Sequence, residues 1–435
     1  MIKILQVRNV DNFVESRRQK TSEKDKKTVQ SILNDVRKNG DSAVKKYEQK
    51  FNGRKTSQLR VSEKEIKEAR SKISRKEWGG IADLSWMVYG QENALHWRVD
   101  DAVKKFDGDK DPLSEGEYWV AVEKSLVPIP SVGCYIPGGQ ARYPSSVVMA
   151  VEPAKVAGVK RIVVVSPPGR DGKIDPLTIA AAKRCGVTEI YKVGGAQAIG
   201  ALAYGTKSIP KVDKIVGPGG KFVSIAKSLV SDQTAIDMVA GPTELGIIAN
   251  ASSNPELVAL DLISQAEHSK DTMCFVITKS KTVAKQIQKS LEKLIPDVER
   301  SAIVKQSISK NGFIAVCKNQ NEMIELANKI APEHLELMVE NARSLSKKIT
   351  SAGLLLIGKN TPSAASDYIL GTNHILPTNG FGRTRGGLSV LDFLKLQTVV
   401  ESNKKRYLKF RDELKALTDA EDLPNHYKAV KRRLD

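Results

Sequence analysis

The feature that most restricts the possible fold is an alternation of short β-branched runs with helical stretches, which begins near residue 130. Strands are predicted at 161–166, 189–193 and 214–216, and each is followed by a turn rich in glycine or proline. Helical patterns fill the intervals, as at 176–184. Strands that alternate with helices at this spacing are typical of βαβ units, so the sequence predicts a parallel sheet.

A second series of the same kind follows. It contains a helix that starts at the Asn254-Pro255 pair, a good N-cap and first-turn combination, and runs to about His268. The strands predicted in this series are 245–249, 273–278, 312–317 and 354–357. We therefore expect two α/β units that divide near residues 235–245.

Composition narrows the function classes. The chain has 435 residues, 40% hydrophobic and 27% charged, which is typical of a globular protein, and its formal net charge is +19. Residues 1–76 alone hold 22 Lys and Arg against 10 Asp and Glu. A basic segment can bind nucleic acid, but here acids alternate with bases at helical spacing, as at 62–70. We therefore favour a solvated helical surface and expect no nucleic-acid partner.

Cysteine usage and hydropathy indicate the compartment. None of the cysteines forms a CxxC pair, so neither a disulfide framework nor a thiolate zinc site is indicated. The four are Cys134, Cys185, Cys274 and Cys317. The first eight residues lack the apolar run of a signal peptide, and no apolar run approaches the ~20 residues that span a bilayer. We expect a soluble cytoplasmic protein that binds no membrane.

Three of the five histidines lie beside groups suited to metal binding or acid–base chemistry. The clusters are Gln265 with His268, Glu333 with His334, and Asp367 with His374. Imidazole together with carboxylate or carbonyl oxygen suits zinc. A polar histidine near a helix end is more often a surface or capping group, however, and periodicity does not show that the three clusters meet in space.

Two glycine loops follow predicted strands. The loops at 194–197 (Gly-Gly-Ala-Gln) and 217–220 (Gly-Pro-Gly-Gly) could present backbone N–H groups to a phosphate at a helix N-terminus. Neither matches the Gly-x-Gly-x-x-Gly dinucleotide fingerprint, so tight turns are the alternative. Cys134 beside another rigid loop could be a nucleophile for aldehyde oxidation, but no histidine neighbours it in sequence, and we favour a packed thiol.

Several longer motifs resemble the histidinol dehydrogenase family. They run in order from about residue 126 to 398, with a weaker match at 421–434. The matching segments are 132–139 (VGCYIPGG), 142–147 (RYPSSV), 153–159 (PAKVAGV), 193–198 (VGGAQA), 264–268 (SQAEH), 331–337 (APEHLEL) and 371–378 (GTNHILPT). Long motifs in a fixed order make the resemblance specific.

The resemblance implies a zinc-dependent, NAD-linked homodimer that oxidises L-histidinol through L-histidinal to L-histidine, the last step of histidine biosynthesis. The implied fold is α/β, with two Rossmann-like parallel-sheet domains, a helical N-terminal region and a helical C-terminal tail. The expected segments are a helical region at 1–134 that joins the second α/β domain, the first domain at 135–242, the second at 243–388, and a helical dimerisation tail at 389–435.

The same resemblance assigns roles to single residues. His334 and Glu333 would be catalytic, the first accepting the hydroxyl proton of the alcohol and the second activating water for the aldehyde step. One zinc per subunit would be bound by Gln265, His268, Asp367 and, from the partner subunit, His426. The substrate-binding positions are Thr243, Gln265, His268, His334, Asp367, His374, Glu421 and His426.

Tyr135, Gln197 and Gly220 match NAD contacts of the family. Gly220 stands where the family usually has Asn, so one expected contact loses its side chain, whereas Thr243 replaces a usual Ser and keeps the hydroxyl. Two alternatives stay open at this point. One is a related zinc and NAD dehydrogenase for another small polar alcohol, and the other is an inactive homologue, against which the complete metal set argues.

Overall fold

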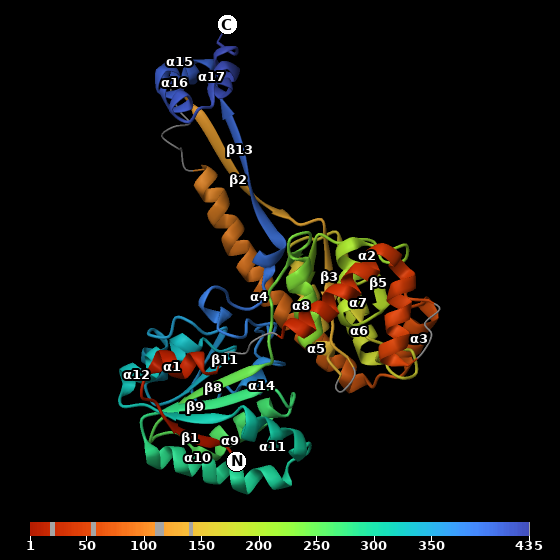
Figure 1. Cartoon of the computed structure of the whole chain (residues 1–435), viewed down its shortest axis with the longest axis vertical. Coiled ribbons are helices and arrows are strands. Elements are labelled where there is room, and N and C mark those ends of the chain that lie inside the picture. Colours follow the sequence, from red (N-terminus) through yellow and green to blue (C-terminus); the bar gives the residue numbers. More distant parts are fainter. Residues whose placement is uncertain (18–21, 54–57, 109–116, 139–141, 435) are drawn as a thin grey trace.

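The computed structural model describes residues 1–435 apart from 18–21, 54–57, 109–116, 139–141 and 435. Within these residues, two parallel sheets form two α/β bodies, and a long arm projects away from both (Figure 1). The predicted α/β class with parallel sheets is confirmed.

The first body is built on five parallel strands in the order β5-β4-β3-β6-β7. They are β3 (Ser131–Tyr135), β4 (Arg161–Ser166), β5 (Glu189–Lys192), β6 (Lys214–Val216) and β7 (Ala235–Ile236). Their β-branched runs suit strands that are buried on both faces, as a parallel sheet requires. The chain order reverses between β3 and β6, and open α/β sheets bind ligands beyond the carboxyl ends of their strands at such a point.

Helices cover both faces of this sheet. On one face α5 and α6 pack with α3 and α4, and on the other face α7 and α8 lie beneath α2. Their bounds are α2 (Glu23–Asn52), α3 (Glu63–Ser71), α4 (Arg75–Gly108), α5 (Pro144–Val156), α6 (Pro176–Arg184), α7 (Gly195–Tyr204) and α8 (Lys221–Val230).

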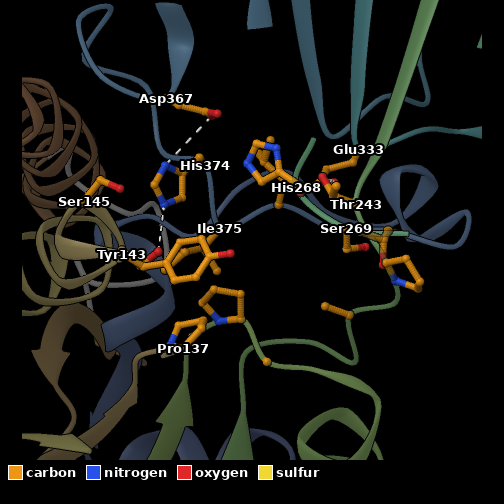
Figure 2. A pocket seen from close by; sticks show the side chains of 18 of the residues that line it. Pro137, Tyr143, Ser145, Thr243, His268, Ser269, Glu333, Asp367, His374 and Ile375 are labelled. Carbon is orange, nitrogen blue, oxygen red and sulfur yellow. Dashed lines mark hydrogen bonds and ion pairs between the residues drawn. The ribbon is translucent and has the colours of Figure 1, made fainter. Parts of the chain in front are cut away.

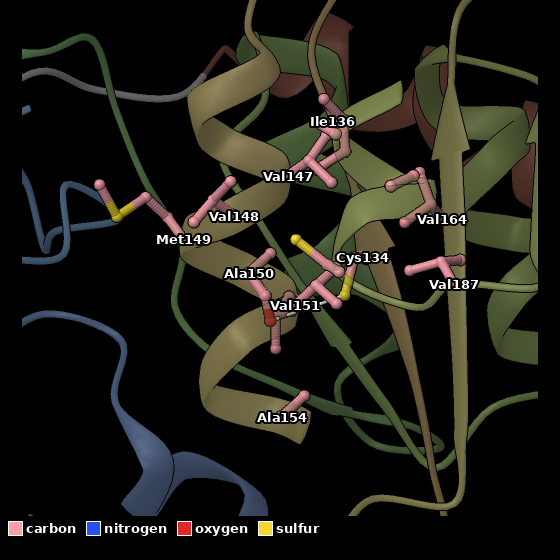
Figure 3. Packing of buried hydrophobic residues seen from close by; sticks show 14 of the residues in the cluster. Cys134, Ile136, Val147, Val148, Met149, Ala150, Val151, Ala154, Val164 and Val187 are labelled. Atoms are coloured by element: carbon pink, nitrogen blue, oxygen red, sulfur yellow. Dashed lines mark hydrogen bonds between the residues drawn. The ribbon is translucent and has the colours of Figure 1, made fainter. Parts of the chain in front are cut away.

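Cys134 lies in the apolar layer between α5 and β3 (Figure 3). It packs among buried side chains such as Val147 and Val151, and its Sγ lies 3.9 Å from the carbonyl oxygen of Ala150. Burial raises the pKa of this thiol far above its ordinary value. Cys134 is therefore a packed thiol, as expected, and the nucleophile alternative is wrong.

The second body contains six parallel strands in the order β1-β10-β9-β8-β11-β12. They are β1 (Lys3–Gln6), β8 (Glu244–Ala249), β9 (Met273–Thr278), β10 (Phe313–Val316), β11 (His334–Met338) and β12 (Leu354–Ile357). One face is covered by α9 (Pro255–Ala266), α10 (Lys281–Leu294) and α11 (Ser301–Lys310). The other face is covered by α1 (Val10–Glu15), α12 (Gln320–Ile330) and α13 (Ala342–Ser346).

The expected assignment of residues 1–134 to the second body is only partly right. β1 pairs with β10, and α1 packs on α12, so the first 15 residues do join the second sheet. By contrast, α2 and α3 pack on the first body, and β3 begins at Ser131, inside the segment expected to be separate from that body. Amphipathic spacing shows that a helix buries one face, but it does not show which sheet that face contacts.

The arm consists of the last part of α4, the ribbon of β2 (Val120–Pro128) and β13 (Leu394–Ser402), and a helical tip, whereas the first part of α4 packs on the first body (Figure 1). The tip contains α15 (Lys404–Lys409), α16 (Arg411–Ala420) and α17 (Pro424–Lys431). The expectation of a helical segment at 389–435 is thus wrong for 394–402, where alternating Leu and β-branched residues form a strand. None of the described helices is both long enough and apolar enough to cross a bilayer.

Gly217 permits the close approach of β3 and β6 at the carboxyl edge of the first sheet. Its φ is +111°, and an added Cβ would collide with the carbonyl oxygen of Tyr135. A Gly217→Ala variant should therefore lose about 3 kcal/mol or more of unfolding free energy, because the backbone is strained and the edge must open. Gly80→Ala, at an exposed position of α4 with open space around the new Cβ, should instead gain about 0.5–1 kcal/mol. Denaturant unfolding of both variants checks this, and equal midpoints would contradict it.

Candidate functional site

A cavity of about 380 Å³ lies where the two bodies meet (Figure 2). On one side it is lined by residues that follow β3 and β6, namely Pro137 and the loop 217–220. On the other side it is lined by Thr243 and Glu333, which immediately precede β8 and β11. The carboxyl edge of one sheet therefore faces the amino edge of the other, and the reversal point of the first sheet opens into the cavity.

Gln265 and His268 enter the cavity from the end of α9. The Gln265 amide nitrogen donates to the Thr243 hydroxyl at 2.8 Å, and its amide oxygen accepts a bond from the Ser363 hydroxyl at 3.3 Å. These two bonds fix the orientation of the amide. His268 follows the last turn of the helix, and burial lowers its pKa. Both side chains therefore line the cavity.

Glu333 is a buried carboxyl group held by β8. One of its oxygens accepts bonds from the Thr243 hydroxyl, at 2.5 Å, and from the backbone N–H of Glu244, at 2.8 Å. Burial is the largest influence and raises the pKa of Glu333 to about 8, with smaller contributions in the same direction from Glu244 and Asp367. In the free protein at neutral pH, the protonated form of this carboxyl therefore predominates.

His334 begins β11 and is almost fully buried. Its Nδ1 lies 3.3 Å from the carbonyl oxygen of Glu244, and its Nε2 lies 3.8 Å from an Asp367 carboxylate oxygen. Burial lowers the pKa of His334 to about 3, so the imidazole is neutral. The carbonyl contact places the ring hydrogen on Nδ1, which leaves the Nε2 lone pair facing the cavity.

Asp367 and His374 come from the loop that follows β12. Asp367 ends the short helix α14 (Ser363–Ser366), and one of its carboxylate oxygens lies 3.9 Å from His374 Nδ1 (Figure 2). His374 Nε2 lies 3.1 Å from the Ser146 hydroxyl on α5, so this ring connects the two bodies. Burial raises the pKa of Asp367 to about 7 and lowers that of His374 to about 4.

Four buried polar atoms in this cavity have no hydrogen-bond partner among the described residues. They are His268 Nδ1, His334 Nε2, Asp367 Oδ1 and His374 Nδ1. An unpaired buried polar atom costs about 1–3 kcal/mol, so a group of them in one cavity indicates that a ligand completes their bonding. In the described part of the chain, no three His, Cys, Asp or Glu side chains are already grouped so that they could hold a metal ion.

Of the three residues expected to contact a dinucleotide, Gly220 lines the cavity, whereas Tyr135 and Gln197 do not. The Tyr135 hydroxyl accepts a bond from the Gly195 N–H at 3.1 Å, and Gln197 donates to the Glu48 carboxylate at 2.8 Å. Gly220 lines the cavity directly and is the N-cap of α8. Tyr135 and Gln197 are buried and do not line the cavity in this state.

Glu421 and His426 are not brought to the cavity of their own chain. Glu421 ends α16, His426 lies in α17, and both are exposed in the tip of the arm, well away from the two bodies (Figure 1). Any role of these two residues in a site therefore requires the arm to reach another copy of the chain.

Sequence reasoning missed three polar residues of the site. Glu244 contacts both Glu333 and His334, Ser146 contacts His374, and Ser363 contacts Gln265. The sequence does contain an indication of Glu244, since it is an acidic residue at the start of an apolar strand directly after Thr243. It contains no indication of the two serines, because a hydroxyl group is equally common at an ordinary helix start.

The raised pKa of Glu333 predicts a pH-dependent stability. Between its unfolded value near 4.5 and its folded value of about 8, the folded state retains a proton that the unfolded state has lost. The unfolding free energy of the metal-free protein should therefore fall as pH rises from about 6.5 to 8.5, by about 1.4 kcal/mol for each unit of pKa difference that is titrated. His334 and His374 have lowered pKa values, so below about pH 6.5 the unfolded chain binds protons that the folded protein does not. Their contribution to the unfolding free energy therefore falls below this pH window and is constant within it.

Glu333→Gln should make this pH dependence less steep, since the amide does not titrate while Glu244 and Asp367 still do, whereas the exposed Glu299→Gln should keep the wild-type slope. Urea unfolding at three pH values measures all three proteins. Identical slopes for the wild type and Glu333→Gln would show that this carboxyl is not protonated in the fold.

Comparison with known proteins identifies the family. A sequence model of histidinol dehydrogenase matches residues 15–434. The histidinol dehydrogenase of Methanococcus maripaludis is 43% identical over 409 residues, which cover 94% of this chain and 93% of that protein. That of Bacillus licheniformis is 39% identical over 415 residues, with coverage of 95% and 94%. The crystal structure of histidinol dehydrogenase from Elizabethkingia anophelis aligns with a TM-score of 0.88 at 32% identity and covers 100% of this chain and 98% of that one. The chain belongs to the histidinol dehydrogenase family.

Proposed function

We propose that the protein oxidises L-histidinol through L-histidinal to L-histidine with two molecules of NAD, the last step of histidine biosynthesis. The observation that carries the proposal is the position of the Glu333–His334 pair. This pair lines the same cavity as His268 and Asp367, which both have unpaired buried atoms. The loop 217–220 lines the cavity on the side of the first sheet. An alcohol dehydrogenase needs a base, a substrate anchor and a hydride acceptor within reach of one carbon atom.

NAD, which accepts a hydride in each oxidation, would lie at the carboxyl ends of β3 and β6. Gly220 supports this placement, because α8 starts there without a side-chain cap and so presents free N–H groups. Gln197 offers a buried amide oxygen that has no partner among the described residues. With glycine at position 220, the contact there is limited to backbone atoms.

His334 would accept the hydroxyl proton of the alcohol in the first oxidation. Its ring is neutral because burial lowers its pKa to about 3, and its Nε2 lone pair faces the cavity without a partner among the described residues. The Glu244 carbonyl oxygen, 3.3 Å from Nδ1, fixes the tautomer and the ring plane. A base that is already deprotonated and oriented takes the proton as the hydride leaves.

Glu333 would take a proton from water when the aldehyde is oxidised. In the free protein, burial holds its pKa at about 8, so an approaching cation is needed to favour the carboxylate. The zinc ion proposed for this cavity would supply such a charge and would favour the carboxylate form of Glu333.

The donor set of the cavity suits one zinc ion per subunit, since nitrogen and oxygen ligands from histidine, carboxylate and amide are typical of such sites. We propose that Gln265, His268 and Asp367 hold it together with the partner's His426. The unpaired buried atoms of His268 and Asp367 support this assignment. Bound zinc would act as a Lewis acid that anchors the imidazole and amine of the substrate.

A homodimer is supported by the exposed apolar surface along α4 and the arm. Large side chains along α4, β13 and the tip are exposed to between 62% and 74% of their area, more than is usual for such groups. They are Trp86, Trp97, Val400 and Leu417. We propose that in such a homodimer Glu421 and His426 of one chain complete the cavity of the other.

A cytoplasmic location is part of the proposal. All four cysteines are free and buried, which suits a reducing compartment in which no disulfide framework is needed. The substrate is a small-molecule metabolite, and nothing in the proposed reaction calls for a membrane or a nucleic acid.

The reaction itself gives the direct test. Purified protein should reduce two NAD for each L-histidinol consumed, should lose this activity on treatment with a chelator, and should regain it when Zn²⁺ is added. Absorbance of NADH measures the activity, and elemental analysis measures the metal. A small polar alcohol without an imidazole should give no turnover above background. Full activity in a sample verified to be metal-free would overturn the zinc assignment.

The shared site is tested by mixing two inactive variants. His426→Ala lacks the residue supplied to the partner, and the double variant Glu333→Gln/His334→Asn lacks the catalytic pair of its own cavity. In a heterodimer, one of the two sites receives every intact group, so activity should return to roughly half that of a wild-type site pair. Each variant alone is the control. Verified heterodimers that stay inactive would exclude a site completed across the interface.

A further inference from the structure

Glu244 directs three of its polar groups to the catalytic pair. Its backbone N–H donates to the Glu333 carboxylate at 2.8 Å, and its backbone carbonyl oxygen lies 3.3 Å from His334 Nδ1. One oxygen of its carboxylate accepts the backbone N–H of Glu333 at 3.2 Å. The two glutamates are therefore bound reciprocally, each carboxyl to the backbone of the other.

The second carboxylate oxygen of Glu244 accepts the backbone N–H of Asn379 at 3.0 Å. This bond attaches the start of β8 to the loop that carries His374 and Thr378. One buried side chain thus fixes three segments, which are the starts of β8 and β11 and the loop 373–379. No described cationic side chain pairs with it, and burial raises its pKa to about 7.

Burying a carboxyl group without a cationic partner costs more free energy than is needed to stabilise a strand end. An apolar residue of similar volume would avoid the desolvation of a carboxylate altogether. The cost is balanced if the carboxylate has a task in the reaction. We propose that Glu244 is the positioning residue of the site. Its carboxylate holds the start of β11 against the start of β8, and this keeps its backbone N–H on the Glu333 carboxyl and its backbone carbonyl oxygen beside His334 Nδ1, which fixes the tautomer that accepts the substrate proton. This inference rests on the roles proposed above for Glu333 and His334.

Glu244 also adds a negative charge beside Glu333. The titratable groups that face Glu333 are Glu244 from β8, His334 from β11 and Asp367 from the loop after α14. Since both carboxylates oppose its ionisation, removal of one should let Glu333 ionise at lower pH. On the role proposed for Glu333, the rate of L-histidinal oxidation increases with pH as this carboxyl ionises, so in the variant the increase should occur at lower pH.

The test compares Glu244→Gln with Glu92→Gln. Glu92 of α4 is a matched control, because it is also buried, has a pKa raised to about 7, and accepts one backbone N–H, that of Val390 at 2.6 Å, outside the cavity. L-histidinal is supplied directly, and single-turnover rates of its oxidation with NAD and its reduction with NADH are measured from pH 6 to 9.

In Glu244→Gln, oxidation of L-histidinal should slow about 10–100-fold, reduction should slow less, and the rising part of the oxidation profile should move down by about half a pH unit or more. Glu92→Gln should leave both profiles where they are. In a Glu333→Gln background, Glu244→Gln should have little further effect on oxidation, because the group that it positions has already been removed. Equal slowing of both half-reactions with an unmoved profile, or losses that multiply in the double variant, would overturn the inference.

Glu244→Asp provides a second variant if the amide does not fold. It keeps the charge but is one methylene shorter and cannot reach both the Glu333 and the Asn379 N–H groups. Oxidation should slow while the pH profile stays in place, and wild-type rates would count against a positioning role.

Failure of the proposed function is distinguishable, since the wild type would then form no NADH from L-histidinol or L-histidinal. If the wild type turns over and Glu333→Gln is selectively impaired while Glu244→Gln matches Glu92→Gln, only the present inference fails.

Discussion

The contacts between the loop that follows β12 and the first body are the interaction on which the rest of the site depends. Asn373 donates to the carbonyl oxygen of Met149 at 2.7 Å, and His374 contacts Ser146 at 3.1 Å. Further along, Arg385 donates to the carbonyl oxygen of Asp237. These contacts hold the carboxyl edge of one sheet against the amino edge of the other, with the cavity between the two edges.

Burial of carboxyl groups that pair with no described cationic side chain gives this cavity its chemical character, although Arg142 and Arg300 also line it. The pKa values of Glu244 and Asp367 are both raised to about 7 and that of Glu333 to about 8, chiefly because these carboxyls are removed from water. The neighbouring imidazoles are neutral for the same reason and offer no positive charge. A positively charged ligand therefore gains from entering, and both a protonated amine and a divalent metal meet that requirement.

The sequence predicted well which residues form strands, but it did not predict which segments pack against one another. Runs such as 161–166 and 273–278 are β-branched, bounded by turn residues and buried on both faces, so their identity is local information. The motif residues Gln265, Glu333 and Asp367 do line one cavity, but only family resemblance suggested that they meet, because their separation along the chain carries no geometry. The partners of α2 and the position of Glu244 between the two catalytic side chains depend on packing among distant segments, which no single-chain pattern encodes.

The pairing of β1 with β10 has a consequence for how the protein is made. The first strand of the chain adds in parallel to a strand about 310 residues further on, and the Gln6 side chain bonds to the backbone of Val316 across that distance. At ribosomal rates of about 5–20 residues per second, β1 leaves the ribosome roughly 15–60 s before its partner exists. During that interval the first body can fold around α2, while the N-terminal strand keeps unpaired backbone groups that could join another sheet edge. Nascent chains of this protein should therefore depend on protection of their first ten residues until the second sheet is complete.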